Sequence, residues 1–446
     1  MPVNRLLITM SLPMIASMLI QALYNVVDSV FVSRISEEAL SAVSMAFPMQ
    51  NLLIGVATGL GVGTNALLSR ALGCKDQKRA NQMAMHGIFL SAISYVIFLI
   101  LGLTIARLFF VAQGADKMIA DYGQTYLSIV MCASFGILFE IMFERLLQST
   151  GKTIYTMFTQ GTGAIINIIF DPVFIFGLGP FPEMGIAGAA TATVMGQIVA
   201  ALMAVFFNMR VNDEIQIDFR KFKAKLKIIG DILYIGVPTI IMIAMSSVMT
   251  FGMNRILVGF SSTAVAVFGV YFRLQSFAFM PIFGLNNGMV PIIAYNYGAA
   301  KTKRITRTLQ LAILYGTLIM ILAFLIAQLL TEPLLALFNA SEEMMAIGIV
   351  ALRTISLGFL LAGANVVVSS FFQAMGNGVY SMIVSIFRQL VLLLPLAYIF
   401  SLTGNVDLVW LSFPIAEALA FALGMYLLYR IYRKIIRPLR EAHPED

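Results

Sequence analysis

Charged side chains are scarce in this chain. Asp, Glu, Lys and Arg make up 11% of the 446 residues, whereas roughly 25% is usual in soluble domains. Hydrophobic residues make up 60%, and the mean hydropathy is +0.90. A soluble fold could not bury so much apolar surface. Apolar stretches of about 20 residues, each long enough to cross a hydrocarbon core of roughly 30 Å, recur along the chain. The composition therefore predicts an all-α integral membrane protein.

Residues for covalent and metal chemistry are also few. The two cysteines, Cys74 and Cys132, lie far apart and outside any CxxC or Cys/His pattern. The sequence therefore indicates neither a disulfide framework nor a metal site of that kind. It also lacks an Asp-rich diphosphate motif, HExxH and GxSxG, which argues against a membrane-embedded enzyme. We expect a protein that is not an enzyme and has no cofactor.

The net charge of +7 does not indicate nucleic-acid binding, because the basic residues form short clusters between apolar segments. Such clusters orient a chain in a membrane. The apolar segments predict about twelve helices, near residues 5–33, 42–70, 83–111, 121–149, 154–178, 185–209, 228–258, 265–296, 305–331, 344–372, 379–402 and 407–433. On this count the clusters at 75–79, 220–227, 301–307 and 430–440 fall on one side. By the positive-inside rule we expect a multi-pass plasma (inner) membrane protein with both termini in the cytoplasm.

The chain contains an internal repeat. A shift of 225 positions without a gap pairs Pro13 with Pro238, Gly59 with Gly284, Gly63 with Gly288 and Gln148 with Gln373. Matches of glycine, proline and polar residues at one fixed separation are not expected by chance in apolar segments. They predict an N-terminal six-helix lobe (1–211), a cytoplasmic basic linker (212–227) and a C-terminal six-helix lobe with a basic tail (228–446). Two such pseudo-symmetric bundles would enclose a central cleft.

The second span carries Gly55, Gly59 and Gly63, a double GxxxG pattern, and the eighth span repeats it with Gly284 and Gly288. Small residues at this spacing allow two helix backbones to approach closely. We interpret these glycines as packing positions.

Two acidic residues stand out within predicted spans, where a carboxylate costs roughly 2.5 to 3.5 kcal/mol and marks a functional site by default. Asp28 ends a polar stripe at helical spacing with Gln21, Tyr24 and Asn25. Asp171 lies four residues after Asn167, on a face that Gly163 and Gln160 continue, and it precedes Pro172. Because proline removes one intrahelical hydrogen bond, a carbonyl is left free near this carboxylate. We expect both stripes to face the protein interior.

Other charged residues also fall within or near the spans. Glu144, beside Arg145 near the cytoplasmic end of its helix, is expected to be a solvated or paired interfacial charge, while Glu140 lies deeper. The partners of Arg388 cannot be read from the sequence. The residues expected to line a substrate cleft are Gln21, Tyr24, Asn25, Glu140, Gln160, Arg273 and Glu417.

The chain resembles prokaryotic members of the multidrug and toxic compound extrusion (MATE) family over nearly its whole length. The resemblance rests on Leu12-Pro13 and on the segments YNVVDSVFVS (24–33), GLGVGTNALLSRALG (59–73), GLNNGMVPIIAYNYGA (284–299), DPVFIFGLG (171–179) and GIAGAATAT (185–193). It implies two six-helix bundles around a cleft. It also implies export of amphipathic, often cationic drugs in exchange for H+ or Na+, and hence a role in antibiotic resistance.

The resemblance also implies a site for the coupling cation. By motif position its members are Asp28, Tyr126, Asn167, Asp171 and Thr193. Asp28, Asn167, Asp171 and Thr193 supply the hard oxygen ligands that suit Na+, and the same set suits a shared proton, so the choice of ion stays open. Met253 lies at the repeat position of Asp28. We therefore expect coupling to be asymmetric between the halves.

The expected function is a secondary antiporter that works by alternating access, with small-molecule drugs, organic cations and the lipid bilayer as partners, and as a monomer. The alternative from another class is a flippase for lipid-linked precursors, which has a related fold. Such a flippase would need a strongly cationic cleft to hold a diphosphate. The intramembrane charge here is instead led by acids in the N-terminal half.

Overall fold

The computed structural model describes residues 1–338 and 340–443, and the elements found there are all helices. Among these residues, 10 helices are long and apolar enough to cross a membrane, or up to 12 spans if each of two bent helix pairs is one span. The all-α membrane fold predicted from the sequence is confirmed.

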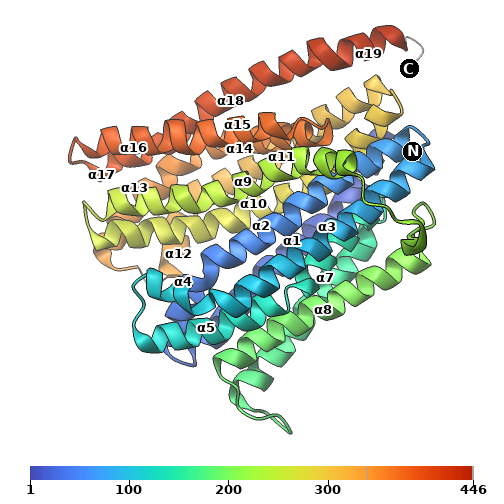
Figure 1. Ribbon diagram of the computed structural model, residues 1–446. Helices are drawn as coiled ribbons and strands as arrows, with labels where there is room; N and C mark the ends of the chain where they lie inside the picture. The colour runs from blue at the N-terminus through green and yellow to red at the C-terminus, as the bar shows by residue number, and fades with distance from the viewer. Residues whose placement is uncertain (339, 444–446) are drawn as a thin grey trace. The chain divides into compact units, whose positions relative to one another are not determined.

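The helices are shown in chain order in Figure 1. Those of the first half are α1 (Val3–Ser33), α2 (Glu37–Gly73), α3 (Gln77–Thr104), α4 (Ala106–Ala112), α5 (Lys117–Cys132), α6 (Phe135–Ser149), α7 (Thr153–Phe176) and α8 (Ile186–Arg210). Those that follow are α9 (Leu226–Leu257), α10 (Ser262–Gly298), α11 (Thr302–Leu329), α12 (Thr331–Ala336), α13 (Glu342–Ser356), α14 (Phe359–Ala374), α15 (Gly378–Ile386), α16 (Leu394–Ser401), α17 (Val406–Trp410), α18 (Ser412–Ile431) and α19 (Arg437–Ala442).

Helix boundaries repeat at the separation found in the sequence. The bounds of α2 and α10, and those of α3 and α11, are each 225 residues apart. The local chemistry repeats too: Ser36 accepts a hydrogen bond from the backbone N–H of Ala39 at the start of α2, as Ser261 does from that of Ala264 at the start of α10. Such caps satisfy N–H groups that the helix leaves without a partner. The repeat is therefore a structural one.

The two halves differ at the segment that corresponds to α7 in the repeat. The segment 378–401, which corresponds to α7, is divided into α15, a π-helical turn (Phe387–Leu393) and α16. Leu392 and Leu396 stand 225 residues after Asn167 and Asp171. Asn167 and Asp171 of α7 therefore have apolar counterparts in the second half.

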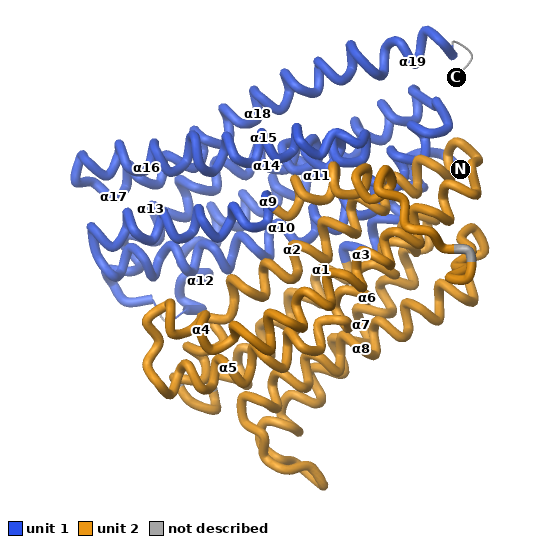
Figure 2. The backbone as a smooth tube through the Cα atoms, viewed as in Figure 1, with its two compact units in different colours: residues 1–15, 241–446 blue, residues 16–240 orange. Residues whose placement is uncertain are grey.

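The structure contains two compact units, shown in Figure 2. Unit 2 comprises Ala16–Ile240, and unit 1 comprises Met1–Ile15 with Ile241–Asp446. In unit 2, α7 packs along α8, α6 packs on α8, and α2 contacts α3, α5 and α6. In unit 1, α11 packs on α10 and α14, and α14 packs on α18. The lobes predicted as 1–211 and 228–446 have different bounds and stay a prediction.

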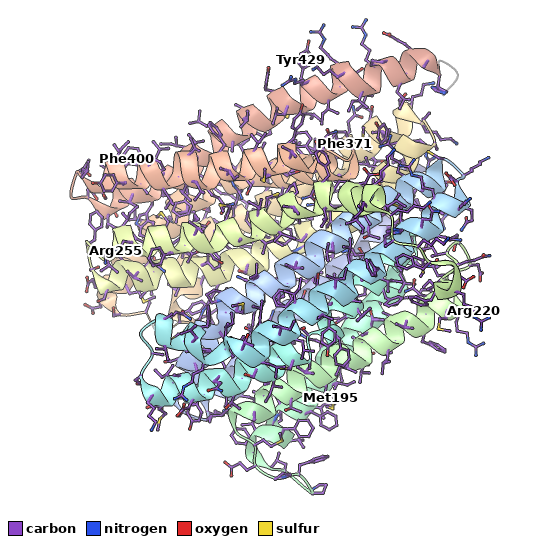
Figure 3. The ribbon with its side chains drawn as sticks, viewed as in Figure 1. Met195, Arg220, Arg255, Phe371, Phe400 and Tyr429 are labelled. Carbon is purple, nitrogen blue, oxygen red and sulfur yellow. The ribbon has the colours of Figure 1, made fainter. Side chains whose placement is uncertain are left out.

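The basic segment between α8 and α9 forms a short 3-10 turn (Phe219–Lys221). Arg220 in this turn is exposed and lies beyond the end of α8 (Figure 3). The buried ring of His86 anchors the following residues, because its Nε2 accepts a hydrogen bond of 2.9 Å from the backbone N–H of Lys225. Just before α9, this contact ties the segment to α3.

The glycines of the GxxxG patterns lie where two helix backbones meet. A Cβ atom on Gly63 of α2 would come within 2.4 Å of the carbonyl oxygen of Ile232 in α9, inside unit 2. A Cβ on Gly288 of α10 would come within 2.8 Å of the Cα of Ser11 in α1, inside unit 1. The packing role interpreted from the sequence agrees with this geometry. These contacts join the first part of α9 to unit 2 and the start of α1 to unit 1.

We expect Gly63→Ala to destabilise the protein by about 1–3 kcal/mol, because the added methyl group forces two backbones apart. Gly161→Ala in α7 is the matched control, since a Cβ there meets nothing within 4 Å. Thermal unfolding of the detergent-solubilised protein measures both variants. An unchanged midpoint for Gly63→Ala would contradict the close packing.

Candidate functional site

Two carboxyl groups meet inside unit 2. Asp28 belongs to the polar stripe of α1, and Asp171 is fully buried on α7. The two carboxyl groups are close enough to interact directly. An ionised carboxylate has no hydrogen to donate, so two carboxyl groups attract each other only when one of them carries a proton. A pair of this kind can hold one proton.

Asn167 and Thr193 flank this pair. With its amide oriented to satisfy both neighbours, Asn167 donates to Asp171 Oδ2 at 3.1 Å, and its oxygen accepts from Thr193 Oγ1 at 3.2 Å. The close packing of α7 on α8 makes this possible, because Gly163 and Gly196 face each other there. A larger residue at either glycine would separate Asn167 from Thr193.

Tyr126 of α5 completes the group that was predicted by motif position. It is buried and lies within electrostatic range of Asp28 and Asp171. Its hydroxyl accepts a hydrogen bond of 2.9 Å from Gln50 Nε2 on α2. Gln50 was not among the predicted site residues. The signal available in the sequence was the adjacent amides Gln50 and Asn51 in an otherwise apolar stretch.

The five predicted residues thus come together from α1, α5, α7 and α8 of one unit. Of the remaining stripe on α1, Tyr24 is half-buried and lies within electrostatic range of Asp28, Asp171 and Glu140, while Gln21 and Asn25 are exposed. The stripe therefore leads from the acidic pair to the surface of the unit.

Glu144 corrects one expectation. It was predicted to be a solvated or paired interfacial charge, but its side chain is 2% exposed. Thr159 Oγ1 donates to one carboxyl oxygen at 2.6 Å, and Gln160 Nε2 donates to the other at 2.8 Å. Arg145 Nη1 donates to Gln148 Oε1 at 2.8 Å, and its charge also attracts Glu144. The sequence could not reveal this because the partners lie on another helix, α7.

Unit 1 contains a different polar group. Arg388 Nη1 lies 3.1 Å from Glu417 Oε2, and Asn365 Nδ2 donates to Glu417 Oε1 at 2.6 Å. These side chains come from the π-helical turn, α18 and α14, so sequence spacing gave no sign of their contact. Arg273 is exposed on α10, and Met253 is fully buried. The acid of unit 1 is therefore neutralised by an arginine, whereas the acids of unit 2 face each other.

A bundle that spans a membrane many times and holds a polar, acidic site inside its spans is typical of a membrane transporter. The family model MatE matches residues 13–173 and 238–399, one stretch in each repeat. The chain belongs to this family, the MATE family of multidrug efflux transporters.

Individual relatives and solved structures are consistent with this family membership. The "Multidrug export protein MepA" of Staphylococcus haemolyticus is 28% identical over 434 residues, which cover 95% of this chain and 93% of that protein. The crystal structure of MATE in complex with MaL6 has a TM-score of 0.92 at 28% identity and covers 99% of this chain and 98% of its own. A transporter of the MOP superfamily from Pyrococcus furiosus, whose reverse binding-pocket polarity suggests a different function, also has a TM-score of 0.92 at 28% identity, with coverage of 99% and 97%.

We expect Arg388→Met to destabilise the protein by about 2 kcal/mol, because it leaves the buried Glu417 without its cation. The partial exposure of Arg388 keeps the loss below that of a fully buried pair. The double variant Arg388→Met/Glu417→Gln should recover most of the stability, since no charge is then left buried. A double-mutant cycle of thermal unfolding measures this. Additive losses would contradict the pairing.

Proposed function

We propose that the protein exports amphipathic organic cations in exchange for protons. The facing carboxyl groups of Asp28 and Asp171 carry the proposal, because such a pair holds one proton readily and loses it only when another cation or water stabilises the resulting charge. A proton and an organic cation then compete for the same negative charge. Such competition is the physical basis of antiport.

Binding must also change the conformational equilibrium for transport to occur. A ligand shifts two conformations only by its difference in affinity for them. The pair draws its groups from α1 and α7, while Tyr126 and Thr193 come from α5 and α8. A movement of α1 relative to these helices would separate Asp28 from Asp171 and change the affinity for the proton. Binding at this site would then drive alternating access.

Sodium is the alternative coupling ion. Asp28, Asp171 and Thr193 bring oxygen atoms to the site, and Asn167 adds its amide oxygen. Na+ would have to bind between two ionised carboxylates, whereas one proton on the pair removes the repulsion between them. The geometry favours the proton on this ground.

The negative charge of the acidic pair and the names of the relatives support organic cations as the substrate class. The relative in Staphylococcus haemolyticus is named a multidrug export protein, and the exposed amides of Gln21 and Asn25 lead to the acidic pair. The remaining features of the proposal are a plasma membrane location, cytoplasmic termini and a monomeric transporter. They rest on the distribution of basic residues and on the presence of the whole repeat in one chain.

The test is efflux of a fluorescent organic cation from proteoliposomes under separately imposed proton and sodium gradients. The proton gradient should drive efflux by the wild-type protein, and Asp28→Asn and Asp171→Asn should each reduce it to the rate of protein-free vesicles, because an amide cannot exchange the proton. Glu183→Gln, in an exposed loop, is the control. Wild-type rates in both Asn variants, or efflux driven by sodium alone, would overturn the proposal.

A further inference from the structure

A second pair of acids occupies the interior of unit 2, away from Asp28 and Asp171. Glu140 and Glu144 lie one turn apart on α6 and are close enough to interact electrostatically. Arg145, the next residue along α6, attracts Glu144 electrostatically and also donates to Gln148. Two adjacent buried carboxyl groups repel each other when both are ionised, so a proton on one of them stabilises the pair. The exchange of substrate for proton described above makes no use of them.

The partners of Glu144 can serve both of its protonation states. The hydroxyl of Thr159 lies 2.6 Å from Glu144 Oε1 and 2.8 Å from the backbone carbonyl of Thr156. When Glu144 is ionised, the hydroxyl donates to the carboxylate. When Glu144 is protonated, the carboxyl group donates to the hydroxyl, which rotates to donate to Thr156. A proton can therefore arrive and leave without stranding a buried polar group.

These acids lie between the Asp28–Asp171 pair and one end of the unit. On α7, Gln160, which bonds to Glu144, and Asp171 are eleven residues apart, about 16 Å along the axis. A proton therefore cannot pass directly from Asp171 to Glu144. Tyr24 lies within electrostatic range of Asp28, Asp171 and Glu140, and Glu140 lies next to Glu144. The groups therefore form a series across this distance.

The series ends near a basic surface. Glu144 is five residues from the end of α6, about 8 Å along the axis. The following turn carries Lys152, which pairs with Glu214 at 2.9 Å. Basic residues gather on the cytoplasmic side of membrane proteins. Glu144 is thus the buried acid placed to exchange protons with the inner aqueous phase.

We propose that Glu140 and Glu144 form a proton relay between the Asp28–Asp171 pair and the inner aqueous phase. The relay rests on the proton-coupled function proposed above and adds the route by which the proton leaves. The proton moves from the pair to Glu140, from Glu140 to Glu144, and from Glu144 to water. At each step one carboxyl group becomes a carboxylate as the next carboxylate becomes a carboxyl group, so charge and protons balance. Thr159 is a positioning residue for Glu144.

The test measures proton release and substrate exchange, the two parts of the transport cycle, separately in proteoliposomes. Proton-driven dye efflux requires proton release, whereas exchange of labelled for unlabelled dye uses only the substrate-loaded protein. We expect Glu144→Gln to lower driven efflux to less than about a tenth of the wild-type rate and to leave dye exchange unchanged. Glu144→Asp should restore part of the driven rate, because it restores a proton carrier.

A matched pair at position 159 tests the hydroxyl. Thr159→Ser keeps the group that rotates, and Thr159→Val removes it at nearly the same volume. Driven efflux should fall only in Thr159→Val, with dye exchange intact in both variants. Equal losses of driven efflux and exchange in Glu144→Gln would assign Glu144 a structural role and overturn the relay, as would wild-type driven efflux.

The relay can fail separately from the proposed function. If Asp28→Asn and Asp171→Asn abolish driven efflux while Glu144→Gln and Glu140→Gln do not, the relay is wrong and proton coupling stands. If the Asp variants pump at the wild-type rate, proton coupling at this pair is wrong, and the relay falls with it.

Discussion

The contact between Asp28 and Asp171 is the interaction on which the rest of unit 2 depends. Two carboxyl groups in a low-dielectric interior repel each other when both are ionised, and they attract when they share a proton. Asn167 donates to one oxygen of Asp171 and is itself held by Thr193, through the close packing of α7 on α8. The glycines at that contact are thus as necessary to the site as its polar residues.

The two halves of the chain keep one backbone plan and differ in where charge is placed. Helix boundaries and caps recur 225 residues apart, but Met253, Leu392 and Leu396 stand at the positions of Asp28, Asn167 and Asp171. In unit 1 the buried acid, Glu417, is held by Arg388 at the start of a π-helical turn. An acid neutralised by a fixed guanidinium is less able to exchange protons than one facing another acid. This contrast supports coupling in the first half alone.

Close helix packing also explains why α1 and α9 are each divided between the two units. The start of α1 is grouped with unit 1, and the first part of α9 with unit 2. In each case a helix end lies against glycines of the long helix α10 or α2, where no side chain separates the backbones. Removal of side-chain volume at these positions increases the van der Waals contact that stabilises helix association in a membrane. The repeat therefore places corresponding glycines in both units.

The sequence by itself determined the membrane class, the positions of the spans, the internal repeat and the identity of the buried acids on α1 and α7. These follow from hydropathy, from matches at a fixed separation and from helical spacing, all of which are local or periodic. It did not determine that Gln50 bonds to Tyr126, that Thr159 and Gln160 hold Glu144, or that Arg388 pairs with Glu417. Those contacts join side chains of different helices, and one helix's periodicity does not specify which residue of another helix lies opposite. Only the tertiary structure, through the packing and register of neighbouring helices, decided them.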